Sequence, residues 1–264
     1  MLRWSMNLFR VRGIQLSIHS SFFLLVGYVA WEGWTAARWP GALWLVLGML
    51  GVFVCVTLHE LGHAAAARYF GIRVPRILLM PIGGMAEMES IPRRPREEII
   101  IALAGPMVNY VIIGLLMIFV RFPADWDANY LELSPMGLGR YLVIANAVLG
   151  VFNLLPAFPM DGGRVFRALL AMRFSYLRAT KIAAHTGKVI AAAGAAYLIF
   201  YQGNYLGGVL FAFIIFAGQR ELNAVARKER DDAHWRSIES RFRPPLAPPI
   251  EVTADVNPPE PRAL

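Results

Sequence analysis

Residues 41–68 read GALWLVLGMLGVFVCVTLHELGHAAAAR, and this stretch decides the class of fold. It carries no Asp, Glu, Lys or Arg as far as Leu58, and a helix of about 20 apolar residues crosses the roughly 30 Å hydrocarbon layer of a bilayer. Three polar side chains then follow at His59, Glu60 and His63. Because ionisable groups are costly inside a membrane, they mark functional sites by default. The stretch therefore predicts a transmembrane helix that carries a chemical site.

The whole chain has the composition of an integral membrane protein. A soluble domain is about 45–50% apolar with glycine included and about 25% charged, whereas these 264 residues are 57% hydrophobic before their 23 glycines are counted and only 17% charged. The same figures exclude a disordered chain, and a single cysteine, Cys55, excludes a disulfide scaffold. A net charge of +8 would suggest nucleic acid as a partner of a soluble protein, but in a membrane protein basic residues first report orientation.

Five runs without charged side chains predict an all-α polytopic membrane protein with six transmembrane helices. The last run, residues 189–219, is too long for one helix and is broken by Tyr201-Gln202-Gly203-Asn204, which predicts a short outer loop between two helices. The expected spans are residues 14–33, 41–68, 97–121, 139–156, 180–201 and 205–226.

The basic residues predict the orientation of these helices. With a cytoplasmic N-terminus, only Arg38, Arg121 and Arg140 fall on the outer side, and the other 23 of the 26 Lys and Arg fall on the cytoplasmic side. This distribution predicts that both termini are cytoplasmic. The expected organisation is a cytoplasmic N-terminus (1–13), a membrane domain (14–226) and a Pro-rich cytoplasmic tail expected to be disordered (227–264).

His59 and His63 have the spacing of two ligands for one metal ion, in the pattern H-E-x-x-H. Positions i and i+4 share one face of a helix, and zinc combines well with imidazole nitrogen. Glu60 lies beside that face and can take a proton from water whose pKa a metal lowers from about 15.7 to about 7. The motif predicts metal-assisted hydrolysis, and a chance match is the alternative.

A second unusual segment, residues 153–163, offers a third ligand. Pro156, Pro159 and a Gly pair argue against a continuous helix, and broken backbone at membrane depth is tolerated only where it is buried in protein or faces water. Catalytic zinc usually has three protein ligands, which makes Asp161 a candidate, although it can equally cap a following helix. Asn153 can donate a hydrogen bond to a substrate carbonyl or to the developing oxyanion.

Residues 71–90 are apolar but interrupted by Pro75, Pro81 and the pair Gly83-Gly84. They are too short and too broken to span a membrane, and they predict a small β-hairpin or sheet at the cytoplasmic interface after the second span. The edge of such a sheet can bind an unwound substrate as an added strand. A plain amphipathic loop is the alternative.

The H-E-x-x-H at 59–63, followed by N-x-x-P-x-x-P-x-D-G at 153–162, resembles the site-2 protease family of intramembrane zinc metalloproteases. Three further short motifs also resemble that family: Gly83-Gly84, Gly105-Pro106-x-x-Asn109 and Ile18-His19-x-Ser21-Phe22. The resemblance implies that His59, His63 and Asp161 bind Zn²⁺, that Glu60 activates water, and that the reaction cleaves a transmembrane segment. It extends to substrate binding by Gly83, Gly84 and Asn109, although Asn109 can also bond between helices.

The compact layout resembles the branch that includes the sporulation pro-sigma-factor proteases, without a cystathionine-β-synthase pair or a PDZ insertion. This implies a bacterial inner membrane and a membrane-spanning protein substrate. The placement of His59, Glu60 and His63 near the basic side of the chain predicts an active site that opens towards the cytoplasm. An anti-sigma factor, a pro-sigma factor and a signal-peptide remnant are all open as substrates, as is the oligomeric state. The bilayer is the other partner. The basic stretch 93–96 indicates lipid headgroup contact, not nucleic-acid binding.

Two other functions compete with proteolysis. Intramembrane His and Asp also mark ion pathways, so a metal-ion transporter is possible, but one tight cluster with a Glu in the water-activating position favours an enzyme. A catalytically silent membrane scaffold is the third hypothesis. It has no need of His59, Glu60, His63 and Asp161 together.

Overall fold

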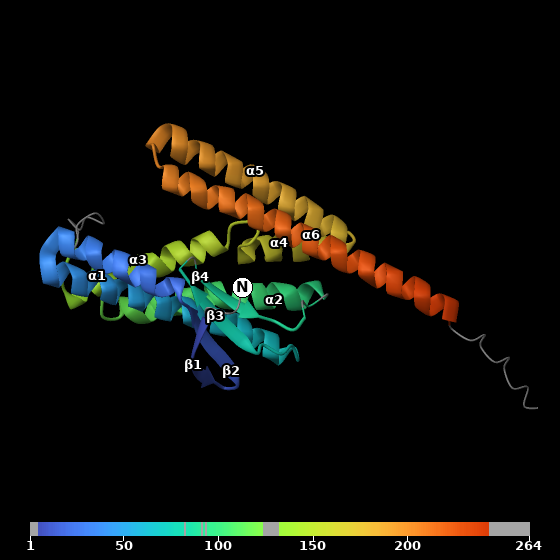
Figure 1. Cartoon of the computed structure of the whole chain (residues 1–264), viewed down its shortest axis with the longest axis horizontal. Coiled ribbons are helices and arrows are strands. Elements are labelled where there is room, and N and C mark those ends of the chain that lie inside the picture. Colours follow the sequence, from blue (N-terminus) through green and yellow to red (C-terminus); the bar gives the residue numbers. More distant parts are fainter. Residues whose placement is uncertain (1–4, 82, 91, 93, 124–131, 243–264) are drawn as a thin grey trace, which may run out of the picture. The chain divides into compact units, whose positions relative to one another are not determined.

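The computed structural model describes residues 5–242 except 82, 91, 93 and 124–131 (Figure 1). The chain divides into two units, Met1–Val225 and Ala226–Leu264. The first unit holds a small sheet and a set of long helices, and it contains every residue of the candidate site.

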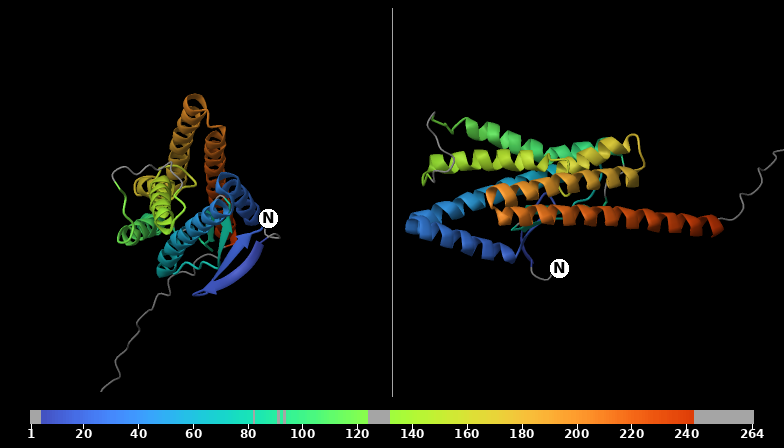
Figure 2. Two further views of the ribbon diagram at one scale, coloured as in Figure 1. Left: turned by 90° about the vertical axis from the view of Figure 1, so that its left-hand side faces the viewer. Right: turned by 90° about the horizontal axis from the view of Figure 1, so that it is seen from above.

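Helix α1, Ser21–Tyr69, is two helices joined by a sharp turn. Ala37 and Arg38 have non-helical dihedral angles, and the chain reverses there so that residues 21–36 and 39–69 form two arms (Figure 2). The arms meet closely, because a Cβ atom on Gly33 would lie only 2.4 Å from the carbonyl oxygen of Gly41. The second arm carries the H-E-x-x-H motif.

Four other long helices and one short helix follow: α2 (Pro95–Met117), α3 (Pro135–Asn153), α4 (Asp161–Ala171), α5 (Tyr176–Gln202) and α6 (Tyr205–Phe242). Five helices of the described chain, all but α4, are long and apolar enough to cross a membrane. The expected break within the last apolar run is confirmed, because α5 ends at Gln202 and is followed by Gly203 in the left-handed conformation (φ 62°) that favours glycine.

The sheet contains four strands in the order β1-β2-β3-β4: β1 (Ser5–Val11), β2 (Ile14–His19), β3 (Arg76–Met80) and β4 (Gly83–Glu87). Strands β3 and β4 are antiparallel, which confirms a hairpin within residues 71–90. Strand β2 pairs in parallel with β3, and β1 pairs antiparallel with β2.

The N-terminal strands correct one expectation. Residues 14–19 were expected to begin the first span, but they form strand β2, and the first helix begins at Ser21. The absence of charge from residue 13 onward indicates burial, and a short apolar run does not distinguish a strand from a helix. Ile14 and Leu16 are indeed buried, but within the sheet.

The main core lies where the sheet packs on α1 and α2. Its most buried members are Ala64 and Ala67 from α1, Ile77 from β3 and Ile101 from α2. This packing places β3 and β4 against the arm of α1 that carries His59. Two smaller clusters hold the segment between α3 and α4, with Ala157 and Met160 against α5 and α6 in one and Phe158 against α5 in the other.

In the second unit, α6 continues as a helix to Phe242. The part of the expected disordered tail between residues 227 and 242 is therefore helical, and that expectation was wrong. The physical reason is that this stretch is rich in Ala, Arg, Lys and Glu, which favour helix, whereas the prolines begin only at Pro244. Residues 243–264, where the Pro-rich composition predicts disorder, lie outside the described residues.

Candidate metal centre

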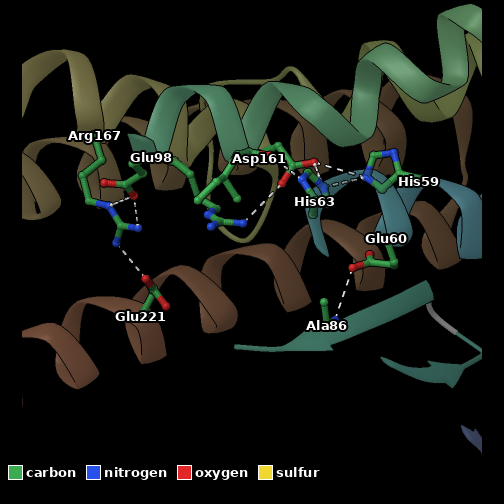
Figure 3. Close-up of polar contacts among 10 residues, drawn as sticks. His59, Glu60, His63, Ala86, Glu98, Asp161, Arg167 and Glu221 are labelled. Carbon is green, nitrogen blue, oxygen red and sulfur yellow. Dashed lines mark hydrogen bonds and ion pairs between the residues drawn. The ribbon is translucent and has the colours of Figure 1, made fainter. Parts of the chain in front are cut away.

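His59 and His63 lie on successive turns of α1 and direct their Nε2 atoms towards each other, 3.1 Å apart. Asp161, the first residue of α4, places its Oδ2 atom 3.1 Å from His63 Nε2 and 3.3 Å from His59 Nε2. All three residues are buried, with 3–7% of their surface exposed. Figure 3 shows the three side chains converging from two helices. The structure thus brings together the three candidate ligands that the sequence predicts.

Hydrogen bonds on the far side of each ring fix the orientation of the two imidazoles. His59 Nδ1 lies 2.5 Å from Asn109 Oδ1, and His63 Nδ1 lies 2.7 Å from the carbonyl oxygen of Ile101. A carbonyl oxygen only accepts, so each Nδ1 carries the proton and each Nε2 keeps a free lone pair. Asn109 is itself held by Asn146, to whose Oδ1 its Nδ2 donates at 2.8 Å.

This donor set fits a metal cation. Two imidazole lone pairs and a carboxylate oxygen converge on one point, and the ring protons of both histidines are directed elsewhere. Zinc prefers imidazole nitrogen and carboxylate oxygen, and a catalytic zinc site keeps three protein ligands and one open position. In such sites the other ring N–H of each histidine usually donates to a carboxylate, a backbone carbonyl or water.

The tight packing of α2 against the imidazoles depends on Gly105. A Cβ atom at this position would lie 2.2 Å from His63 Nε2 and 2.7 Å from His59 Nε2. Any side chain here would therefore occupy the space in which the two rings meet.

Asp161 reaches the histidines because the chain leaves helical conformation after α3 and starts α4 at this residue. The expected break around Pro156 and Pro159 is therefore present. A carboxylate in the first turn of a helix is stabilised by the helix dipole.

Glu60 lies beside the three-residue group and is held by the sheet. Its Oε2 atom accepts a hydrogen bond of 3.2 Å from the backbone N–H of Ala86 on β4. Gly84 packs on the same side chain, since a Cβ atom there would lie 2.6 Å from Glu60 Cγ. Figure 3 shows Glu60 between α1 and β4.

The remaining predicted residues lie on α2, α3 and β4. Asn153 is the half-buried last residue of α3. Gly83 and Gly84 begin β4, and Gly83 has a φ of 135° that favours glycine. Asn109 is fully buried and bonds to His59 and Asn146.

Sequence reasoning missed Asn146 and an ionic cluster of Glu98, Arg167 and Glu221, in which Glu98 and Arg167 are buried. A signal for Asn146 was available, because a polar side chain in the apolar run of 141–160 is a candidate for contact between helices. No local signal joins the three charged residues, which lie on three different helices.

The model of peptidase family M50 matches residues 47–124 and 128–194, which include all three converging side chains. The chain belongs to peptidase family M50. Both motifs that carry the resemblance to site-2 proteases fall within the matched ranges.

Members of this family are similar to the chain over most of its length. Zinc metalloprotease MJ0392 from Methanocaldococcus jannaschii is 40% identical over 190 residues, which are 72% of this chain and 52% of that protein. Stage IV sporulation protein FB from Bacillus subtilis is 28% identical over 207 residues, 76% of this chain and 67% of that protein. The chain thus spans about half the length of the first relative.

A solved structure shares the fold. The site-2 protease from Methanocaldococcus jannaschii superposes with a TM-score of 0.59 and 35% sequence identity, covering 83% of this chain and 95% of that chain. At this identity and coverage, the family assignment made from the motifs is confirmed by structure as well as by sequence.

Proposed function

We propose that the chain is a zinc-dependent intramembrane endopeptidase that cleaves transmembrane segments of membrane-anchored proteins. The observation that carries the proposal is the buried group of His59, His63 and Asp161, set into a long apolar helix with Glu60 beside it. A metal transporter would need ligands along a route, whereas the described residues contain one group of this kind. This supports hydrolysis over transport.

In this proposal His59, His63 and Asp161 hold Zn²⁺, which supplies Lewis-acid chemistry by acidifying water and polarising a peptide carbonyl. Glu60 acts as the general base and later passes its proton to the leaving nitrogen. Asn153 donates a hydrogen bond to the substrate carbonyl as negative charge develops on its oxygen. The position of Asn153 at the end of α3, where the chain turns towards Asp161, supports this role.

The substrate is proposed to bind as an extended strand along the free edge of β4. The N–H of Ala86 donates to Glu60 and so is directed away from β3, which puts the general base beside that edge. Extension matters because a helix hides its peptide bonds from attack. Gly83 and Gly84, at the start of β4, are proposed to form part of that edge. For Asn109, the hydrogen bonds support a role in orienting His59 rather than in contacting substrate.

The membrane arrangement is proposed as six spans, formed by the two arms of α1 together with α2, α3, α5 and α6. The turn at Ala37 and Arg38 supports two spans within α1. The distribution of basic residues supports cytoplasmic termini, a sheet at the cytoplasmic interface and an active site open to that side. We propose a bacterial inner membrane as the location, and an anti-sigma factor, a pro-sigma factor or a signal-peptide remnant as the substrate.

The test uses the full chain co-expressed with single-pass membrane proteins. Glu60→Gln should abolish cleavage while the purified protein still binds zinc, because the glutamine keeps the shape of the side chain but accepts no proton. Glu97→Gln is the matched control, since Glu97 forms an ion pair with the exposed Arg94 and is not part of the group around Asp161. Normal cleavage by Glu60→Gln would refute the proposal. Comparing the membrane proteomes of the two strains would show which full-length substrates accumulate.

A further inference from the structure

Arg167 on α4 is the most buried basic side chain in the described structure, with 1% of its surface exposed. Its Nε donates to Glu98 Oε1 on α2 at 2.8 Å, and its Nη2 donates to the same oxygen. Its Nη1 donates to Glu221 Oε1 on α6 at 2.7 Å. One guanidinium therefore joins three helices, as Figure 3 shows.

The same guanidinium is also enclosed by two aromatic rings. Its central carbon lies 4.9 Å from the ring centre of Phe158 and 5.0 Å from that of Tyr176. Phe158 belongs to the segment that leads into Asp161, and Tyr176 begins α5. Arg167 thus belongs to the helix that starts with Asp161 and contacts the segment just before it.

Stability alone is a poor explanation for this cluster. Replacing a buried ion pair by apolar residues of similar volume is often neutral or stabilising, because burial costs both charges their hydration. Glu98 Oε2 and the hydroxyl of Tyr176 are buried and have no hydrogen-bond partner among the described residues. Two buried polar atoms without partners cost stability. We therefore assign this cluster to holding the helices in a particular orientation rather than to stabilising the fold.

The geometry that needs defining is the rotation of α4. This helix has only 11 residues, a length that is marginal without tertiary contacts. A rotation of about 20° about its axis would move an atom at the roughly 5 Å side-chain radius by almost 2 Å. Ligand distances at a metal centre are held to about 0.2 Å, so Asp161 would be displaced from the histidines.

We infer that Arg167 is a positioning residue for the metal centre: through Glu98, Glu221 and Phe158 it fixes the rotation of α4, and so directs the Asp161 carboxylate at His59 and His63. The inference rests on the proposed zinc site. Arg167 therefore affects metal affinity through Asp161, without touching the metal or the substrate.

The experiment measures zinc affinity of the full-length protein in detergent by competition with a chelator of known affinity, and the visible spectrum of the Co²⁺ form. Arg167→Met should weaken zinc binding roughly 10- to 100-fold, the usual effect of losing a supporting partner, and should change the Co²⁺ spectrum. The zinc affinity of Arg167→Lys should fall between those of the wild type and Arg167→Met, because lysine keeps the positive charge but lacks the planar guanidinium group. Arg140→Met is the control, since it breaks the ion pair between Arg140 on α3 and Glu132, which includes no residue of α4, and should leave affinity unchanged.

A double-mutant cycle separates positioning from a general loss of structure. If Arg167 acts through Asp161, the double variant Asp161→Asn/Arg167→Met should bind zinc no more weakly than Asp161→Asn alone. If the two substitutions act independently, their losses of zinc-binding free energy would instead add in the double variant. If Arg167→Met does not fold, adding Glu98→Gln removes both buried charges and allows the same cycle to be measured.

Unchanged zinc affinity in Arg167→Met, or losses that add in the cycle, would overturn the inference and leave the protease proposal intact. If the wild-type protein binds zinc and the double-mutant cycle gives the expected result, but no membrane substrate is cleaved, the protease proposal is refuted and the inference about Arg167 stands. A wild-type protein that binds no zinc would overturn both.

Discussion

The packing of α2 on the two imidazoles predicts that Gly105→Ala will damage the metal centre through one methyl group. The new Cβ atom would lie 2.2 Å from His63 Nε2, whereas packed heavy atoms lie about 3.5 Å apart, so the ring must retreat by about 1 Å. Ligand distances tolerate about 0.2 Å. We expect zinc affinity to fall roughly 10- to 100-fold, and cleavage to fall about 100-fold, as for a 1 Å misplacement.

The same helix supplies a matched control in Gly114, where an added Cβ atom would meet nothing within 4 Å. Both substitutions gain about 0.5–1 kcal/mol from replacing glycine in a helix, but only Gly105→Ala loses about 1–3 kcal/mol to overpacking. Zinc affinity, cleavage of a single-pass substrate and thermal unfolding should be measured on both variants. Zinc affinity and cleavage in Gly105→Ala within twofold of Gly114→Ala would refute the reasoning.

Two further predictions concern Asn109, which orients His59, and the removal of zinc from the site. Asn109→Leu should lower zinc affinity and cleavage roughly 10- to 100-fold, because His59 loses the acceptor that fixes its Nδ1 proton; equal cleavage by this variant and wild type would contradict it. Removing zinc with a chelator should stop cleavage and lower the unfolding temperature, because a ligand at 100 times its Kd stabilises by about 2.7 kcal/mol. Added zinc should restore both, and a chelator-insensitive unfolding temperature would count against a bound metal.

The convergence of His59, His63 and Asp161 was predictable because each belongs to a motif whose residue types have a chemical reason. The spacing of the histidines fixes a shared helix face, and the prolines before Asp161 break the helix just before that residue. The turn near Gly203 was predictable for the same reason, since glycine marks the end of a helix locally.

The missed elements depend on contacts between distant parts of the chain. Residues 14–19 become a strand because residues 76–79 pair with them, and nothing within the N-terminal run itself distinguishes that outcome from a helix. Glu98, Arg167 and Glu221 lie far apart in the sequence, so only the packing of α2, α4 and α6 brings them together. Pairing partners of this kind are not visible in a single sequence.

The metal centre draws its ligands from distant parts of the chain, since His63 and Asp161 are 98 positions apart. An ion held by both closes the intervening chain, with α2 and α3, into a loop, as a covalent cross-link would. Clips that close long loops are expected to restrict the unfolded chain most. Zinc at this centre would therefore act on assembly as well as on chemistry, by favouring states in which α4 has already docked against α1.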